Sequence, residues 1–181
     1  MRLATAIDAR DTFAVGHSIR VAGYARKIAE RCGYSDRKLS EIYMMGLLHD
    51  VGNLTVSEEI LNKPAALTSA EYDGIREHTL VGAKTLEEFS EMPSLALGAR
   101  WHHERYDGQG YPDGLMGESI PEEARIIAVA EAFDAMNSRR PYRDRLAPEA
   151  IRAALEQGAG TQFDPRFARI MLELIGEDAN G

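Results

Sequence analysis

The chain has 181 residues, of which 44% are hydrophobic and 28% are charged, and this composition fits one globular domain with a sizeable core. A formal net charge of -8 argues against general nucleic-acid binding, which needs a basic face. The single cysteine, Cys32, excludes an intramolecular disulfide, and we expect it to pack in the core of a protein kept in the reducing cytoplasm. No apolar run is long enough for a membrane span through this domain, and no signal peptide is recognisable.

Hydrophobic periodicity and capping residues predict helices throughout the first half of the chain. Gly33 ends one helix, and either Ser35 or Asp36 can cap the next. Thr68 and Glu71 form the pattern of a capping box. The expected helices cover residues 2–10, 18–31, about 36–49, 68–78 and 80–90.

The second half of the chain also shows helical signals, and proline marks several expected first turns. Pro93 starts a helix that ends at the pair His102 and His103, and Pro121 precedes a long helix over 122–138. Two further helices follow near residues 148 and 165, the second with Asp164 as a plausible N-cap. No segment alternates with the period of a strand, so we predict an all-α domain of roughly seven to ten helices.

The stretch from Trp101 to Gly117, WHHERYDGQGYPDGLMG, carries the strongest chemical signal. Its two adjacent imidazoles lead into a glycine-rich loop, which is typical of a metal site with backbone able to approach a substrate closely. A polar turn after a helix is the alternative interpretation.

The remaining histidines favour the metal site. The chain has five histidines, each at or near an expected helix end. A single histidine in such a place is more often a cap or a satisfied core residue, but this whole set is hard to explain in that way. One of them is followed directly by a carboxylate, Asp50, and histidine with carboxylate suits Zn, Fe, Mn or Ni better than Ca or Mg.

Several motifs together resemble a known family. His49-Asp50 is similar to the doublet of the HD superfamily of metal-dependent phosphohydrolases. HHERYDGQGYP, the following GLMGESIPEEARIIAVAEAFDAM and RRPYR, and the earlier DTFAVGHSIRVAGYA resemble the HD-GYP branch, whose members hydrolyse cyclic di-GMP. The resemblance runs from about residue 7 to residue 145 and implies an all-α, HD-type helical bundle with a glycine-rich GYP loop. It also implies that residues 1–181 are a single HD-GYP domain from a longer bacterial signalling protein.

The resemblance implies two divalent transition metals, with iron expected first and manganese as the alternative. One metal would be bound by His17, His49, Asp50 and Glu131, and the other by Asp50, His78, His102 and His103. Asp50 would bridge them, and a hydroxide between the metals would attack phosphorus. The implied activity is a cyclic di-GMP phosphodiesterase that releases pGpG, GMP or both.

The resemblance also assigns substrate contacts. Gly110 and Tyr111 would line the substrate cleft, although Tyr111 can equally serve to pack the loop onto the core. Arg140 and Arg143, in the run RRPYR, would contact phosphate or guanine, and a solvated turn that balances nearby acids is the alternative. Asp134, one turn after Glu131, can orient a metal ligand.

The chain departs from the family pattern at Asn53, where a lysine usually places a cation against the scissile phosphate. Asparagine donates a hydrogen bond without charge, so activity is expected to be reduced. Glu131 stands where aspartate is usual, which shifts the carboxylate but keeps its charge. An acid that serves a third metal in some members is replaced by Phe13, which favours two metals.

These departures leave alternatives open. The chain can be a catalytically weak module that binds metal and nucleotide and contacts a partner such as a diguanylate cyclase domain. It can also hydrolyse another nucleotide or cyclic dinucleotide, because the HD doublet alone is common to many substrates.

Overall fold

The computed structural model describes residues 2–11, 14–89, 91–139 and 144–178. Every regular element within these ranges is helical, which confirms the all-α prediction. The elements are α1 (Arg2–Asp8), α2 (His17–Arg31), α3 (Asp36–Leu48), η1 (Val51–Thr55), α4 (Glu58–Leu61), α5 (Ser69–Glu87), α6 (Leu95–Trp101), η2 (Gly117–Ser119), α7 (Glu122–Asn137), α8 (Pro148–Gly158) and α9 (Pro165–Asp178).

The capping residues identified in the sequence begin the helices as expected. The Ser35 side chain accepts a hydrogen bond from a first-turn backbone N–H, so Ser35 rather than Asp36 caps α3. Thr68 and Glu71 form both bonds of the capping box at the start of α5. Asp164 Oδ1 accepts from Arg166 N at 2.8 Å, which confirms the cap of α9. Each such cap stabilises its helix by typically ~1 kcal/mol.

The predicted break between residues 78 and 80 is wrong, because α5 runs unbroken from Ser69 to Glu87. Neither glycine nor proline interrupts the backbone there, and the Thr79 hydroxyl donates to the Arg76 carbonyl inside the helix. The short elements η1 and α4 were not predicted, because segments of this length show no hydrophobic period. Helix α6 begins at Leu95 rather than at Pro93.

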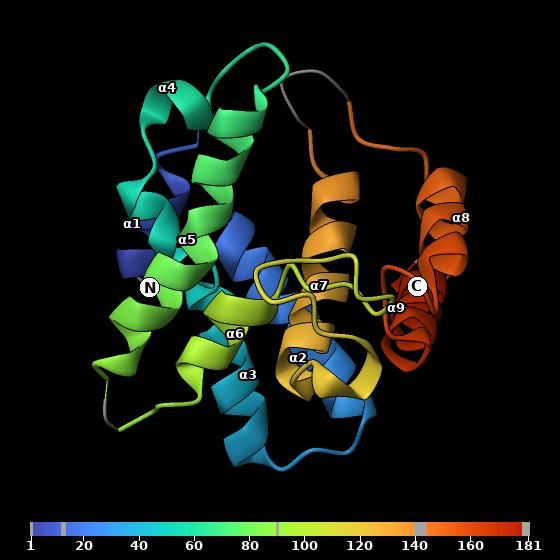
Figure 1. Ribbon diagram of the computed structural model, residues 1–181. Helices are drawn as coiled ribbons and strands as arrows, with labels where there is room; N and C mark the ends of the chain where they lie inside the picture. Colours follow the sequence, from blue (N-terminus) through green and yellow to red (C-terminus); the bar gives the residue numbers. More distant parts are fainter. Residues whose placement is uncertain (1, 12–13, 90, 140–143, 179–181) are drawn as a thin grey trace.

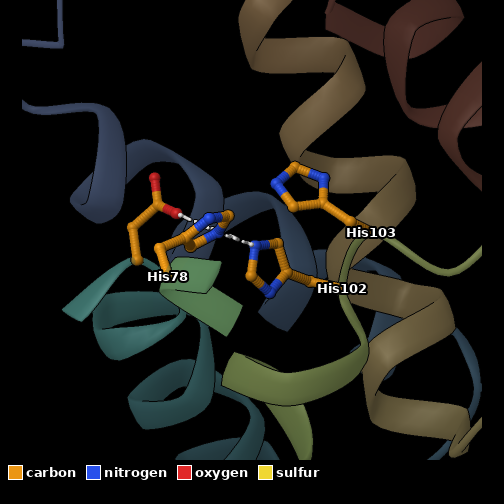
Figure 2. A group of neighbouring side chains, drawn as sticks. His78, His102 and His103 are labelled. Carbon is orange, nitrogen blue, oxygen red and sulfur yellow. Dashed lines mark hydrogen bonds and ion pairs between the residues drawn. The ribbon is translucent and has the colours of Figure 1, made fainter. Parts of the chain in front are cut away.

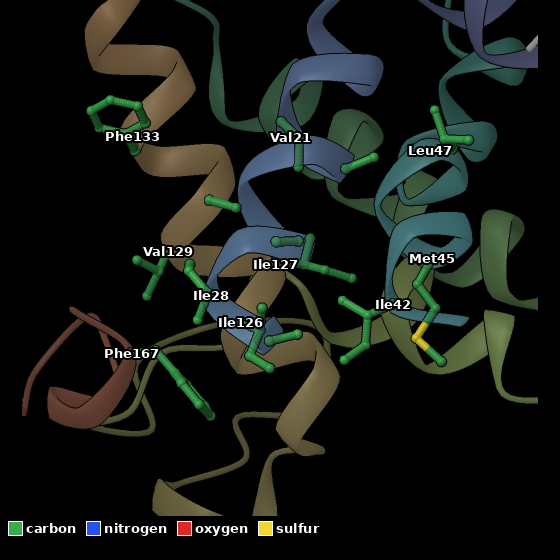
Figure 3. Close-up of a cluster of buried hydrophobic side chains, with 14 of the residues drawn as sticks. Val21, Ile28, Ile42, Met45, Leu47, Ile126, Ile127, Val129, Phe133 and Phe167 are labelled. Atoms are coloured by element: carbon green, nitrogen blue, oxygen red, sulfur yellow. The ribbon is translucent and has the colours of Figure 1, made fainter. Parts of the chain in front are cut away.

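The core forms where α2 packs against α3 and α7 (Figure 3). In Figure 1, α8 and α9 lie on one side of α7, and α5, α4 and α1 lie on the other. Fully burying one large aliphatic side chain stabilises the fold by roughly 1.5–3 kcal/mol. The core side chains labelled in Figure 3 are Val21, Ile28, Ile42, Met45, Leu47, Ile126, Ile127, Val129, Phe133 and Phe167.

Two glycines allow helices to approach closely beside the histidines. A Cβ on Gly46 of α3 would lie 2.7 Å from the Ala22 Cα of α2. A Cβ on Gly52 of η1 would lie 1.9 Å from the carbonyl oxygen of His78 in α5. The second contact sets how close Asp50, just before η1, comes to His78. The described helices include none with the length and apolarity required to cross a membrane.

The close approach at Gly52 yields a stability prediction. Gly52→Ala is expected to lower the free energy of unfolding by roughly 1–3 kcal/mol, because the added methyl meets backbone that cannot move without shifting α5. Gly74→Ala is the matched control in the exposed part of α5, where a Cβ meets nothing within 4 Å. That change should raise stability by about 0.5–1 kcal/mol. Urea unfolding of the metal-free proteins measures both, and equal effects would contradict the packing argument.

Candidate metal centre

Asp50 lies at the centre of a group of imidazoles that come from different elements. It follows the C-terminal end of α3 and precedes η1. Its Oδ1 lies 3.3 Å from His78 Nε2 and 3.7 Å from His102 Nε2, and its Oδ2 lies 3.5 Å from His49 Nε2. One carboxylate therefore reaches rings from α3, α5 and the end of α6.

Helix backbone fixes which ring nitrogen carries the proton in the neutral form of these three imidazoles. Each Nδ1 contacts a carbonyl oxygen three or four residues earlier, at 2.8 Å for His49, 2.6 Å for His78 and 2.8 Å for His102. A carbonyl only accepts hydrogen bonds, so Nδ1 must carry the proton. In the neutral ring, Nε2 is then a bare lone pair directed toward Asp50.

Two of these nitrogens face each other, and the distance between them can be compared with the spacing of two ligands around one metal ion. His78 Nε2 and His102 Nε2 are 3.2 Å apart (Figure 2). Ligand atoms about 2.0–2.2 Å from one common ion stand roughly 3.0–3.5 Å apart, so the spacing suits a metal. His49 is fully buried, and its Nε2 has no hydrogen-bond partner among the described residues. Buried imidazole nitrogens whose lone pairs are free of hydrogen bonds suit a transition metal as ligands.

The candidate ligand atoms fall into three overlapping groups, with all atoms of a group within 4.8 Å of one another. The groups are Asp50, His78, His102 and His103; His17, His49 and Asp50; and His49, His102 and Glu131. Figure 2 shows the rings of His78, His102 and His103 converging. The ligands that the resemblance gives to one metal thus lie together, and Glu131 groups with His49 and His102.

Electrostatics favours metal-binding protonation states at His102, His103 and Asp50. Burial lowers the pKa of His102 well below its ordinary value, and the neighbouring imidazoles add to the effect. Burial also lowers the pKa of His103. Burial alone would raise the pKa of Asp50, but the surrounding histidines hold it far below its usual range. Neutral imidazole beside an ionised carboxylate needs no proton release to accept a cation.

His17 is oriented by a buried carboxylate on α7. Its Nδ1 lies 2.7 Å from Asp134 Oδ2, in accordance with the expectation that Asp134 orients a ligand. Arg20, one turn further along α2, donates to both oxygens of Asp134, at 2.6 Å from Nε and 3.0 Å from Nη2. The role of Arg20 was not predicted, because the sequence does not show which helix faces α2.

Asn53 lies beside the same centre but toward a small hollow. This hollow, of about 130 Å³, is lined by Asn53, His17, Asp50 and Glu131 among others. The Asn53 Oδ1 is buried and has no hydrogen-bond partner among the described residues. The side chain is thus within the site and available to hydrogen bond there.

A larger cavity, of about 390 Å³, opens on the other side of Glu131. His103, Gly110 and Tyr111 line it. The Tyr111 ring packs 4.8 Å from the His103 ring and 4.6 Å from the Arg76 guanidinium carbon, so Tyr111 both lines the cavity and holds the loop in place. Gly110 is required by the loop itself, because a Cβ there would lie 2.3 Å from Arg105 N.

Glu104 organises this loop, and the sequence analysis did not single it out. It is only 3% exposed, and its carboxylate accepts from Asp113 N at 2.7 Å and from Leu115 N at 3.0 Å. Asp113 in turn accepts from the Arg100 and Trp101 side chains of α6. The only sequence signal for Glu104 was its position directly after the two histidines. Its role could not be predicted from that position, because its partners lie nine and eleven residues later.

Three residues named in the sequence analysis lie outside the described residues: Phe13, Arg140 and Arg143. Their neighbour Arg139 is exposed and forms an ion pair of 3.2 Å with exposed Asp144.

Comparison with known proteins identifies the family. The model of the HD domain family matches residues 2–167. The chain is 41% identical to the cyclic di-GMP phosphodiesterase response regulator RpfG of Xanthomonas campestris over 94% of this chain and 46% of that protein. It is 38% identical to the 3'3'-cGAMP-specific phosphodiesterase 3 of Vibrio cholerae over 88% of this chain and 35% of that protein. The chain thus spans less than half the length of these relatives.

A solved structure shares the fold. Bd1817, an HDG"Y"P protein from Bdellovibrio bacteriovorus, matches with a TM-score of 0.73 and 16% identity over 88% of this chain and 51% of that chain. The chain belongs to the HD domain family of metal-dependent phosphohydrolases, and its His49-Asp50 doublet and HHERYDGQGYP loop place it in the HD-GYP branch.

Proposed function

We propose that this domain is a metal-dependent phosphodiesterase that hydrolyses cyclic di-GMP to pGpG, GMP or both. The observation that carries the proposal is the convergence of bare imidazole nitrogens on Asp50 at the wall of a large cavity. The relative RpfG, 41% identical, is named a cyclic di-GMP phosphodiesterase. A cavity of about 390 Å³ lies within the usual range for a small-molecule site.

Two divalent metals, iron first or manganese, would be held by the histidines and by Asp50. His17 and His49 would serve one metal, His78, His102 and His103 the other, and Asp50 both. When bound, such a metal pair supplies an activated water for attack on phosphorus and neutralises charge on the phosphoryl oxygens.

The residues of the chain would position the metals and the nucleotide. Asp50 places Oδ2 near His49 and Oδ1 near His78. Hydrogen bonds to helix carbonyls hold the rings of His78 and His102 in these orientations. Tyr111 and Gly110 line the cavity beside His103 and would meet the nucleotide there. Arg140 and Arg143 remain the proposed contacts for phosphate or guanine.

The direct test is an assay of protein purified without air and loaded with iron or manganese. Product release from cyclic di-GMP, followed by chromatography, is expected to fall at least about 100-fold in Asp50→Asn, because the variant loses the shared anionic ligand. Glu156→Gln, an exposed change on α8, is the control and should retain full activity. If wild-type protein with both metals bound releases no product over hours, the proposed activity is wrong. Parallel reactions with 3'3'-cGAMP test the alternative substrate.

Asn53 favours a second candidate function, a binding module with weak catalysis that signals by contacting a partner such as a diguanylate cyclase domain. The residue lies in the site, yet it brings no charge to the phosphate. Asn53→Lys is therefore expected to raise kcat by ~10²–10³. Asn53→Gln keeps the amide and should give no such gain. Turnover confined to the lysine variant would identify the natural domain as a binding module, and an unchanged kcat would exclude a missing cation as the limit.

The contact between Asp134 and His17 yields a prediction about metal affinity. Asp134→Asn removes the anionic acceptor that fixes the His17 ring, so affinity for one of the two metals should fall by about 10–100-fold. Competition with a chelator measures this affinity. Glu156→Gln again provides the control for loss of one negative charge. An unchanged pair of dissociation constants would show that Asp134 does not position the ligand.

A further inference from the structure

Glu131 contacts both halves of the centre. It lies on α7, three residues before Asp134. One of its carboxylate oxygens groups with ligand nitrogens of His49 and His102, all within 4.8 Å. Its Oε2 also lies 3.9 Å from His103 Nδ1. His49 lies in the group with His17, whereas His102 and His103 lie in the group with His78.

Asp50 has the same relation to these rings. It contacts His49 at 3.5 Å and His102 at 3.7 Å, and those two ring centroids are only 5.0 Å apart. Two carboxylates from different elements therefore approach the same two imidazoles. The buried Nε2 of His49 makes no hydrogen bond to the described residues and lies in the same group of candidate ligand atoms as His102 and Glu131.

The location of Glu131 between the two hollows supports the same conclusion. Glu131 lines both the larger cavity beside Tyr111 and the smaller hollow beside Asn53. Its side chain is about one carbon–carbon bond, roughly 1.5 Å, longer than aspartate. That length helps the carboxylate to reach from α7 to the rings of His102 and His103.

We propose that Glu131 is a second bridging carboxylate, which binds both metals together with Asp50. This inference rests on the proposed two-metal centre and deepens it. Two cations about 3.5–4 Å apart repel each other, and each shared carboxylate offsets that repulsion. With two such bridges, the first cation orders both carboxylates and the second enters a prepared site. Metal uptake should therefore be cooperative.

Manganese titration of the metal-free domain, followed by electron paramagnetic resonance, tests the proposal without any turnover. At half saturation, wild-type protein should show mainly the signal of exchange-coupled manganese pairs and little of isolated ions. Glu131→Asp keeps the charge but withdraws the carboxylate, so isolated ions should dominate at half saturation and the second affinity should fall at least about tenfold. Glu131→Gln should weaken the second ion at least as much.

Glu122→Gln is the matched control, since it removes one negative charge from the same helix at a half-buried position paired with Arg166. It should titrate like wild type. Circular dichroism of each metal-free variant verifies folding. Identical titrations of wild type and Glu131→Asp would overturn the bridge, as would a Glu131→Gln variant that loses affinity for the first ion alone. A protein that forms pairs but hydrolyses no cyclic dinucleotide would instead overturn the proposed function and leave the bridge intact.

Discussion

The centre depends on imidazole nitrogens whose lone pairs are held close together by the helix backbone. Carbonyls of α3, α5 and α6 accept the Nδ1 protons of His49, His78 and His102, so in the neutral rings the facing Nε2 atoms of His78 and His102 have no hydrogen between them. This arrangement is unfavourable until a cation occupies the space. The packing of the rest of the fold offsets the cost of this arrangement and keeps the ligands in place. Metal binding should remove the unfavourable contact and so raise the free energy of unfolding of the bundle.

The ligands can converge because backbones approach one another where side chains are absent. Gly52 allows η1 to lie against the His78 carbonyl, and Gly46 allows α3 to lie against α2. These contacts join segments far apart in the sequence, so a substitution at Gly46 or Gly52 should change the positions of the metal ligands. The loop after His103 is fixed differently: the Glu104 carboxylate binds its backbone N–H groups, and the Tyr111 ring packs on His103. Figure 1 shows this loop crossing α7.

The sequence predicted what depends on local physics. Caps at Ser35, Thr68 and Asp164 were identified because their partners lie two to three residues away. The false break in α5 arose because tertiary burial of His78 overrode a weak local pattern. Arg20, Glu104 and the closeness of Glu131 to His102 were not foreseen, since each depends on a partner in another element.

The substrate proposed for this site is anionic, whereas the chain is acidic. The protein carries a formal charge of -8, and Asp50 and Glu131 add negative charge at the place where the proposed substrate would bind its phosphate. Family members can offset this with a lysine, but Asn53 provides only a neutral amide. In the proposed function, attraction for the phosphate would come mainly from the metals and from the proposed contacts Arg140 and Arg143. A second carboxylate shared between the metals is consistent with this requirement, because it secures both cations, on which substrate affinity depends.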